Sequence, residues 1–116
     1  MIPPRRAAAC IGAIGVALGA FGSHGLRSIL EAHDAMRTWQ TASFYHLLHS
    51  VVLLWLSSQT RFPRAVFILF TVGVFLFSGS LYVLSLTTFQ WVGIFTPLGG
   101  TCIILGWLGL LRQPNA

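Results

Sequence analysis

Histidine and hydroxyl side chains lie inside long stretches of this sequence that carry no formal charge. His46 and His49 are three residues apart and Ser78 and Tyr82 are four apart, so a helix would place each pair on one face. Side chains of these types inside a membrane can hold a proton, a metal ion or a small molecule. The candidate set comprises six residues: His24, His46, His49, Ser78, Tyr82 and Thr96.

The candidate set matches known catalytic and metal sites only in part. Ser78 with a histidine and Tyr82 offers plausible chemistry, but no acid completes a triad, because Glu31 and Asp34 belong to a separate polar segment. Two helical histidines plus a distant third are a weak zinc pattern. We therefore expect no catalytic residue, no metal and no cofactor. The alternative to a ligand site is a hydrogen-bonded network that fixes the packing of the helices.

The seven arginines delimit the elements that must position these side chains. Uncharged runs of 20, 23 and 47 residues occupy positions 7–26, 38–60 and 65–111. About 20 apolar residues cross the hydrocarbon core as one helix, so the first two runs fit one span each and the third fits two. A polar patch at 87–91 marks the turn. We predict four membrane helices in one domain (1–116), at 7–23, 39–59, 65–86 and 92–111.

The composition excludes most other classes of protein. Charged residues make up 8% of the 116 positions, hydrophobic residues make up 55%, and the mean hydropathy is +0.79. A typical soluble domain has roughly 25% charged residues and needs them to cover its surface. Disordered chains are poor in apolar residues, and β-barrel strands alternate polar with apolar residues, which these runs do not. We expect an all-α integral membrane protein that folds as a four-helix bundle.

Depth along the expected spans gathers the candidate set in the outer half of the membrane. At 1.5 Å per residue, His46 lies ~10 Å and His49 ~15 Å from the outer end of their span. Ser78 and Tyr82 lie ~20 Å and ~25 Å from the inner end of theirs. The other two candidates lie near the outer ends of the first and last spans. We predict one polar layer that faces the interior of the bundle, since unpaired polar groups are costly in lipid.

The arginines also predict an orientation. Five of them, Arg5, Arg6, Arg61, Arg64 and Arg112, lie on the side of both termini, and two lie on the other side. The positive-inside rule then places both termini in the cytoplasm, in the cytoplasmic (inner) membrane. The net charge of +5 therefore reflects topology, and we expect no nucleic acid among the partners. The expected partners are the lipid bilayer and a homo-oligomer or a larger membrane complex.

The ends of the spans carry further signals. Trp39 and Trp91 lie at the outer ends of two spans, as interfacial aromatic residues do. The first run shares features with a signal peptide, but we expect it to be retained as a span.

The segment 24–38 is amphipathic, with Arg27 and Glu31 spaced to pair, which indicates a short helix on the outer membrane surface. An ordered connecting loop is the alternative.

Small residues predict how the helices approach. Gly15 and Gly19 form a GxxxG motif, for which we favour a contact within the chain over one with a second copy. Pro97, in the segment Thr-Pro-Leu-Gly-Gly, predicts a kink in the last span. Cys10 and Cys102 lie at different depths, so we expect no disulfide.

Four ordered motifs resemble the YgdD-like family of small four-helix membrane proteins. They are AFGSHGL (20–26), FYHLLHS (44–50), FSGSLY (77–82) and TPLGG (96–100), the last followed by Gly106 and Trp107. The resemblance covers nearly the whole chain and implies a four-helix topology. The family is a domain-of-unknown-function group, so it implies no catalytic residue. In the family pattern His46 is less typical of its position than His24 and His49 are of theirs.

Three hypotheses for function follow from the sequence. The first is a structural or accessory membrane protein without enzymatic activity, since the helices are rich in glycine and no reaction centre is recognisable. The second is a binder or conduit for a proton, a metal ion or a small lipophilic ligand through the polar layer. The third, least favoured, is an intramembrane enzyme.

Overall fold

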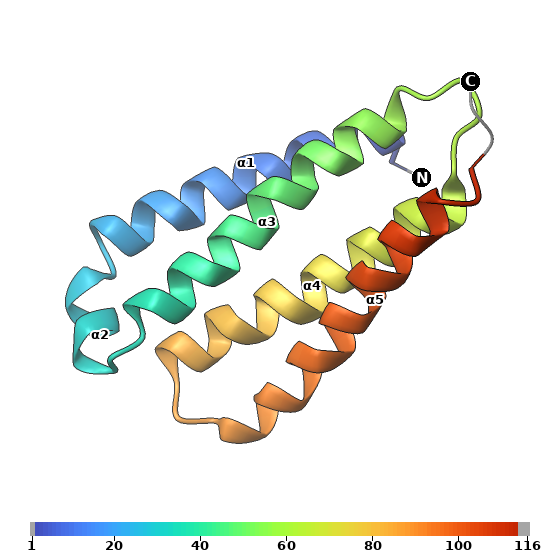
Figure 1. Cartoon of the computed structure of the whole chain (residues 1–116). Coiled ribbons are helices and arrows are strands. Elements are labelled where there is room, and N and C mark those ends of the chain that lie inside the picture. Colours follow the sequence, from blue (N-terminus) through green and yellow to red (C-terminus); the bar gives the residue numbers. More distant parts are fainter. Residues whose placement is uncertain (1, 114–116) are drawn as a thin grey trace.

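The computed structural model describes residues 2–113, and all the regular secondary structure in them is helical. Six helices follow one another: α1 (Pro4–Ser23), α2 (Arg27–Ala32), α3 (Met36–Ser57), α4 (Arg64–Leu86), the 3-10 helix η1 (Gln90–Ile94) and α5 (Phe95–Leu110). Four of them are long and run alongside one another as two helical hairpins, α1 with α3 and α4 with α5 (Figure 1). The start of α1 and the end of α5 lie at the same end of the molecule (Figure 1).

Three of these segments are long and apolar enough to cross a membrane, within the described residues. They are Pro4–Ser23, Arg64–Leu86 and Gln90–Leu110. They correspond to three of the four predicted spans. The remaining predicted span, 39–59, forms α3. This helix has 22 residues and is long enough to cross a membrane, but it is not among the three segments that are both long and apolar enough. Polar side chains concentrated in the first two thirds of α3 lower its hydropathy.

The long helices pack in a row. α1 contacts α3, α3 contacts α4, and α4 contacts α5. Over residues 2–113, the backbone of α1 does not closely approach that of α4 or α5. The central position of α3 and α4 matches their burial, since each has eight buried residues and α1 has three. α1 is therefore held to the other long helices through α3.

Two apolar clusters form the ends of the core. One lies toward the termini and centres on Leu53, Leu56 and Phe70, all fully buried. The other lies toward α2 and contains Leu30, Ala35 and Trp39. On α3 the buried polar side chains, from Ser43 to Ser50, lie between the two clusters, so apolar packing encloses them from both ends.

The short helix predicted between the first two spans is present as α2. Arg27 and Glu31 form the predicted ion pair, at 2.9 Å between Nε and Oε1, and both side chains are more than half exposed. Leu26 caps this helix without a side-chain hydrogen bond, and Ser28 lies inside the helix. Asp34 takes a positive φ of 49° in the turn before α3, a conformation that aspartate tolerates better than most residues.

The structure bears on two packing predictions, the GxxxG motif and the proline of the last span. Gly15 lies against Leu47 and His46 of α3, but a side chain at Gly19 would meet open space, so the GxxxG pair does not act as a unit. The close contact uses Gly22 instead, where a β-carbon would overlap the indole of Trp39.

Pro97 lies in the first turn of α5, directly after η1. The irregularity that proline demands therefore falls at the change from 3-10 helix to α-helix within the segment Gln90–Leu110.

Candidate functional site

His46 joins three helices at the centre of the molecule. It lies on α3, 6% exposed, and its Nε2 donates a hydrogen bond to the Ile11 carbonyl oxygen of α1, at 2.8 Å. Its Nδ1 lies 2.9 Å from the Tyr82 hydroxyl of α4. A carbonyl oxygen can only accept, so the Nε2 atom carries the proton. In the neutral ring, Nδ1 then accepts a hydrogen bond from Tyr82.

Tyr82 and Ser78 extend this contact along one face of α4. The Tyr82 hydroxyl lies 3.4 Å from Ser43 Oγ, and its ring packs on Trp39 with centroids 4.7 Å apart. Ser78 is 1% exposed, and its hydroxyl donates to the Ala42 carbonyl oxygen at 2.8 Å. We call His46, Tyr82, Ser43 and Ser78 the central cluster. The helical spacing of Ser78 and Tyr82 thus turns both toward α3, as the sequence predicts.

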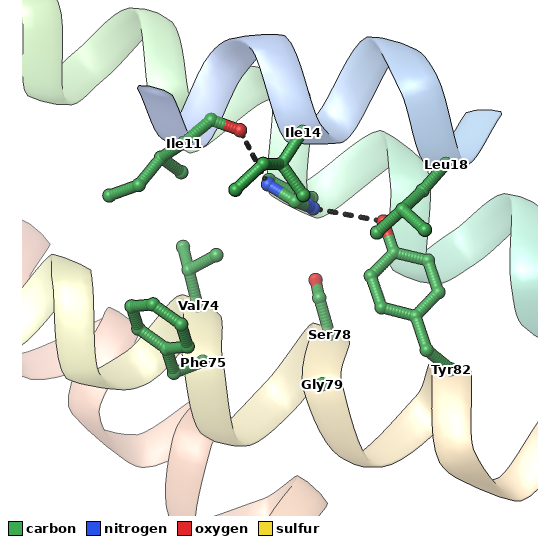
Figure 2. A pocket seen from close by; sticks show the side chains of 9 residues that line it. Ile11, Ile14, Leu18, Val74, Phe75, Ser78, Gly79 and Tyr82 are labelled. Atoms are coloured by element: carbon green, nitrogen blue, oxygen red, sulfur yellow. Dashed lines mark hydrogen bonds between the residues drawn. The ribbon is translucent and has the colours of Figure 1, made fainter. Parts of the chain in front are cut away.

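A pocket of about 180 Å³ opens beside the central cluster, between α1 and α4. Figure 2 shows its side chains converging from both helices. Its walls are almost entirely apolar, and three residues of the central cluster reach it. The lining residues are Ile11, Ile14, Leu18, His46, Val74, Phe75, Ser78, Gly79 and Tyr82.

His49 forms a separate bridge on another part of the α3 surface. Its Nδ1 donates to the Tyr45 carbonyl oxygen at 2.8 Å, and its Nε2 accepts from the indole N–H of Trp107 at 3.1 Å. A carbonyl only accepts and an indole only donates, so these two partners define a neutral ring with its proton on Nδ1. We call His49, Tyr45 and Trp107 the His49 bridge. It connects α3 to α5 across α4.

The other two candidates lie apart from both groups. Thr96 shares a hydrogen bond with Ser80 between α5 and α4. Ser80 is two residues from Ser78, so it points to a different face of α4. His24 is exposed at the end of α1, and its backbone, not its ring, caps that helix. The structure therefore divides the predicted layer into the central cluster, the His49 bridge, an α4–α5 contact and an exposed turn.

Two tryptophans take part in ways that the sequence analysis missed. Trp107 pairs with His49, although 58 residues separate them. Trp39, predicted to be interfacial, is 3% exposed, and its Nε1 donates to the Leu18 carbonyl oxygen of α1 at 2.8 Å. The available signal for Trp39 was Gly22, whose missing side chain makes room for the indole. Trp91 is 67% exposed.

The chemistry available to these groups is that of neutral hydrogen bonding. Within residues 2–113, no group of three or more histidine, cysteine or acidic residues could hold a metal ion. Every buried side-chain nitrogen or oxygen in the same part of the chain has a hydrogen-bond partner. Cys10 and Cys102 are both free thiols. The arrangement can position an uncharged ligand or fix the helices relative to one another.

Known proteins similar to this chain are small membrane proteins without an assigned activity. UPF0382 membrane protein YwdK of Bacillus subtilis is 37% identical over 102 residues, which are 82% of this chain and 81% of the relative. A UPF0382 membrane protein of Staphylococcus aureus is 36% identical over 101 residues, covering 83% and 81%. One of Schizosaccharomyces pombe is 32% identical over 111 residues, covering 90% and 94%. No solved structure matches the chain.

The family assignment rests on the central part of the sequence. Residues 18–100 match a family described as "Protein of unknown function (DUF423)". This segment includes all six candidate residues but not Trp107. These relatives confirm that the chain resembles a family of membrane proteins of unknown function. None of them is named YgdD-like. The chain belongs to the DUF423 family of membrane proteins.

Proposed function

We propose that this chain is a four-span protein of the cytoplasmic membrane that acts as a structural or accessory component and not as an enzyme. The fourth span in this proposal is α3. At 1.5 Å per residue its 22 residues extend about 33 Å, enough to cross the hydrocarbon core. It lies between α1 and α4 in the row of long helices, and both of these neighbours are themselves apolar enough to span.

The distribution of side chains around α3 supports its role as a span. Its polar residues Ser43, His46, His49 and Ser50 are buried against other helices. Its most exposed positions in the same region are large and hydrophobic: Phe44, Leu48, Val51, Leu54 and Trp55. Because these four polar side chains face protein, the helix can lie in lipid despite a moderate mean hydropathy. These four spans would form a bundle of two hairpins.

One observation carries the structural role: side-chain hydrogen bonds tie the long helices together, and every buried side-chain nitrogen or oxygen of the described residues has a partner. Trp39 and His46 join α3 to α1, Tyr82 and Ser78 join α4 to α3, and Trp107 joins α5 to α3. A catalytic site usually leaves reactive groups available to a substrate, whereas these are committed to one another. Such bonds contribute modestly one by one, but together they specify a single packing.

The same contacts give little support to catalysis by Ser78. Its hydroxyl donates to the Ala42 carbonyl oxygen, and both nitrogens of His46 are engaged elsewhere. Ser78 thus has no activating base at hydrogen-bonding distance in the described structure. Glu31 and Asp34, the only acidic residues of the sequence, are exposed in and beside α2.

The four-span topology can be tested with reporter fusions. Full-length protein carrying green fluorescent protein at the C-terminus should fluoresce in cells, because this reporter matures in the cytoplasm. Alkaline phosphatase fused after residue 34 should be active, since the turn after α2 would face the periplasm. A fusion after residue 60 should be inactive. Activity of alkaline phosphatase at position 60 would remove α3 from the set of spans.

The accessory role predicts a stable assembly in native membranes. Tagged protein, cross-linked before solubilisation, should elute with a second copy or with a defined membrane complex. The expected result is one reproducible band above the monomer. A chain that remains monomeric and without partners under these conditions would contradict an accessory role.

A further inference from the structure

A second cleft, between the start of α3 and the end of α4, is lined mostly by polar side chains. Asp34, Arg37, Thr38 and Thr41 line it from the turn before α3 and from the first part of that helix, and Leu81 lines it from α4. Its volume of about 570 Å³ is more than three times the roughly 150 Å³ of a cavity that holds benzene. We call it the interfacial cleft. It differs from the apolar pocket between α1 and α4 because charged groups of both signs line it.

The two charged side chains of the interfacial cleft are unpaired. Asp34 and Arg37 form neither an ion pair nor a side-chain hydrogen bond within residues 2–113, whereas the neighbouring Arg27 and Glu31 pair with each other. α3 begins at Met36, and no side chain caps its first N–H groups. These N–H groups and the Arg37 guanidinium favour an anion at this end of the helix, and the Asp34 carboxylate favours a cation beside it.

Two hydroxyl groups of the interfacial cleft are equally available to a ligand. Thr71 and Thr101, inside α4 and α5, each donate to the carbonyl oxygen four residues earlier. Thr38 and Thr41 belong to α3, yet neither hydroxyl makes a hydrogen bond in the described part of the chain. Both can therefore donate to an anionic oxygen in the cleft.

The turn that carries Asp34 is held against α4. His33 Nδ1 donates to the Ser85 carbonyl oxygen at 3.2 Å, and the Asp34 N–H donates to the Glu31 carbonyl oxygen at 3.1 Å. The start of α3 accordingly lies beside the end of α4 (Figure 1). The backbone at the edge of the cleft is thus held in place by bonds that leave the Asp34 carboxylate free.

The interfacial cleft lies at the membrane boundary in the proposed four-span topology. Asp34 and Arg37 directly precede the uncharged run 38–60, and charged side chains of this kind mark the limit of the hydrocarbon core. Leu81 precedes Leu86, the last residue of α4, by about 8 Å at 1.5 Å per residue. The cleft therefore extends from the level of the lipid headgroups to just inside the hydrocarbon core.

Below the cleft, the same two helix faces continue as apolar surface. Tyr45 lies one helical turn beyond Thr41, Phe77 lies one turn before Leu81, and the two rings pack with centroids 4.8 Å apart. Tyr45 is 37% exposed, and Leu48 beyond it is 44% exposed. A hydrocarbon chain attached to an occupant of the cleft can lie along this face.

We propose that the interfacial cleft binds the headgroup of a phospholipid that carries a primary ammonium group, as phosphatidylethanolamine does. The phosphate binds at Arg37 and the two threonine hydroxyls, the ammonium group donates to the Asp34 carboxylate, and an acyl chain follows Tyr45. A lipid fits better than a free phosphate ester because the cleft continues into an apolar face. This inference adds a lipid partner to the proposed structural role, and it rests on the placement of α3 as a span.

Native mass spectrometry of the full-length protein in detergent micelles tests the lipid preference. Phosphatidylethanolamine, phosphatidylcholine and phosphatidylglycerol with identical acyl chains are titrated separately, and apparent Kd values are taken from the lipid adducts. Phosphatidylethanolamine should bind about tenfold more tightly than phosphatidylcholine, whose methylated ammonium group has no N–H to donate to Asp34. Phosphatidylglycerol carries no cation and should also bind more weakly than phosphatidylethanolamine.

Three variants assign the headgroup to its partners. Asp34→Asn should abolish the preference for phosphatidylethanolamine over phosphatidylcholine. Arg37→Gln should weaken the binding of both lipids by about tenfold, since both carry the phosphate. Glu31→Gln is the matched control, because it changes the net charge as Asp34→Asn does but lies outside the lining, and it should keep the wild-type preference. All three side chains are exposed, and circular dichroism with size-exclusion chromatography checks that each variant folds.

Soluble glycerophosphoethanolamine distinguishes a lipid from a free phosphate ester. At the concentration at which phosphatidylethanolamine saturates the protein, it should not displace the lipid, since it has no acyl chain to lie along Tyr45. Displacement at equal concentration would assign the cleft to a free phosphate ester and overturn the lipid proposal.

Other outcomes would also overturn the proposal. Equal binding of phosphatidylethanolamine and phosphatidylcholine would do so, as would tightest binding of phosphatidylglycerol or an equal loss of preference in Glu31→Gln and Asp34→Asn. The reporter fusions are read separately. Expected fusion activities without a lipid preference would refute the lipid site alone, whereas a lipid preference with an active fusion at position 60 would refute the four-span topology alone.

Discussion

At the scale of single residues, the two histidines of α3 have different hydrogen-bonding constraints. His49 has a donor-only partner at Nε2 and an acceptor-only partner at Nδ1, so its tautomer is determined. His46 faces a carbonyl at Nε2 but a hydroxyl at Nδ1, and a hydroxyl can either donate or accept. The Tyr82 hydroxyl can therefore reorient toward Ser43 without loss of every partner. Of the two rings, His46 is the one beside a pocket.

The His49–Trp107 contact predicts a measurable coupling energy. A double-mutant cycle with His49→Phe and Trp107→Phe should give about 0.6–1.7 kcal/mol of coupling in the free energy of unfolding, the usual range for such bonds between membrane helices. Denaturation of the purified protein in detergent micelles provides the values. Trp91→Phe is the control, because Trp91 is 67% exposed, and its coupling to His49→Phe should be zero. Additive effects of His49→Phe and Trp107→Phe would mean that the bond contributes nothing.

At the scale of elements, glycine placement decides which helices approach. Gly99 of α5 lies so close to α4 that a β-carbon would overlap the backbone nitrogen of Phe77. Gly22 of α1 has the same relation to the Trp39 side chain of α3. Close packing of helix backbones through small residues is the main attraction between helices in lipid, where apolar burial gives no advantage. These glycines therefore stabilise the α1–α3 and α4–α5 contacts.

Alanine at Gly22 should destabilise the α1–α3 hairpin. The added methyl group would overlap an indole that its own bond to the Leu18 carbonyl holds in place. Overpacking of this kind costs about 1–3 kcal/mol. Gly19→Ala should instead leave the free energy of unfolding unchanged or raise it by up to about 1 kcal/mol through helix propensity. Thermal unfolding in detergent compares the two variants, and equal melting temperatures would contradict this account of the glycines.

At the scale of the whole molecule, the row of helices makes stability uneven. α4 contacts both α3 and α5, whereas α1 contacts α3 and the short α2. Only Ala8, Gly15 and Gly22 are buried in α1, and all three are small. Local opening is easiest where few apolar side chains are buried. The α1 side of the molecule is thus the side where the pocket can widen.

Hydrogen exchange should reveal this difference. In detergent micelles, amides in the middle of α1 should exchange faster than those in the middle of α4, which has eight buried residues. Mass spectrometry of peptides from each helix gives the two rates under identical conditions. The middle of α3, with buried neighbours on two sides, serves as the internal reference and should resemble α4. Equal protection of α1 and α4 would show that α1 is held by contacts other than those with α3 and α2.

The sequence by itself determined the helical elements and most of their limits. Arginines and polar turns delimit the uncharged runs because charges are excluded from lipid, and each predicted span has its helix in the structure. The i,i+4 spacing of Arg27 and Glu31 was sufficient to predict their ion pair, since helix geometry alone brings such residues together. Local periodicity also placed Ser78 and Tyr82 on one face.

Only the tertiary structure decided how the polar residues divide among partners. Depth along a helix gives one coordinate and leaves the rotation and the neighbouring helix undetermined, so the sequence predicts His46, His49 and Thr96 in one layer. The structure gives each a different partner: Tyr82 for His46, Trp107 for His49 and Ser80 for Thr96. Partner choice depends on which backbones approach, and that depends on where a glycine meets a large side chain, as at Gly22 and Trp39. Contacts of this kind join residues far apart in the chain, so no local pattern specifies them.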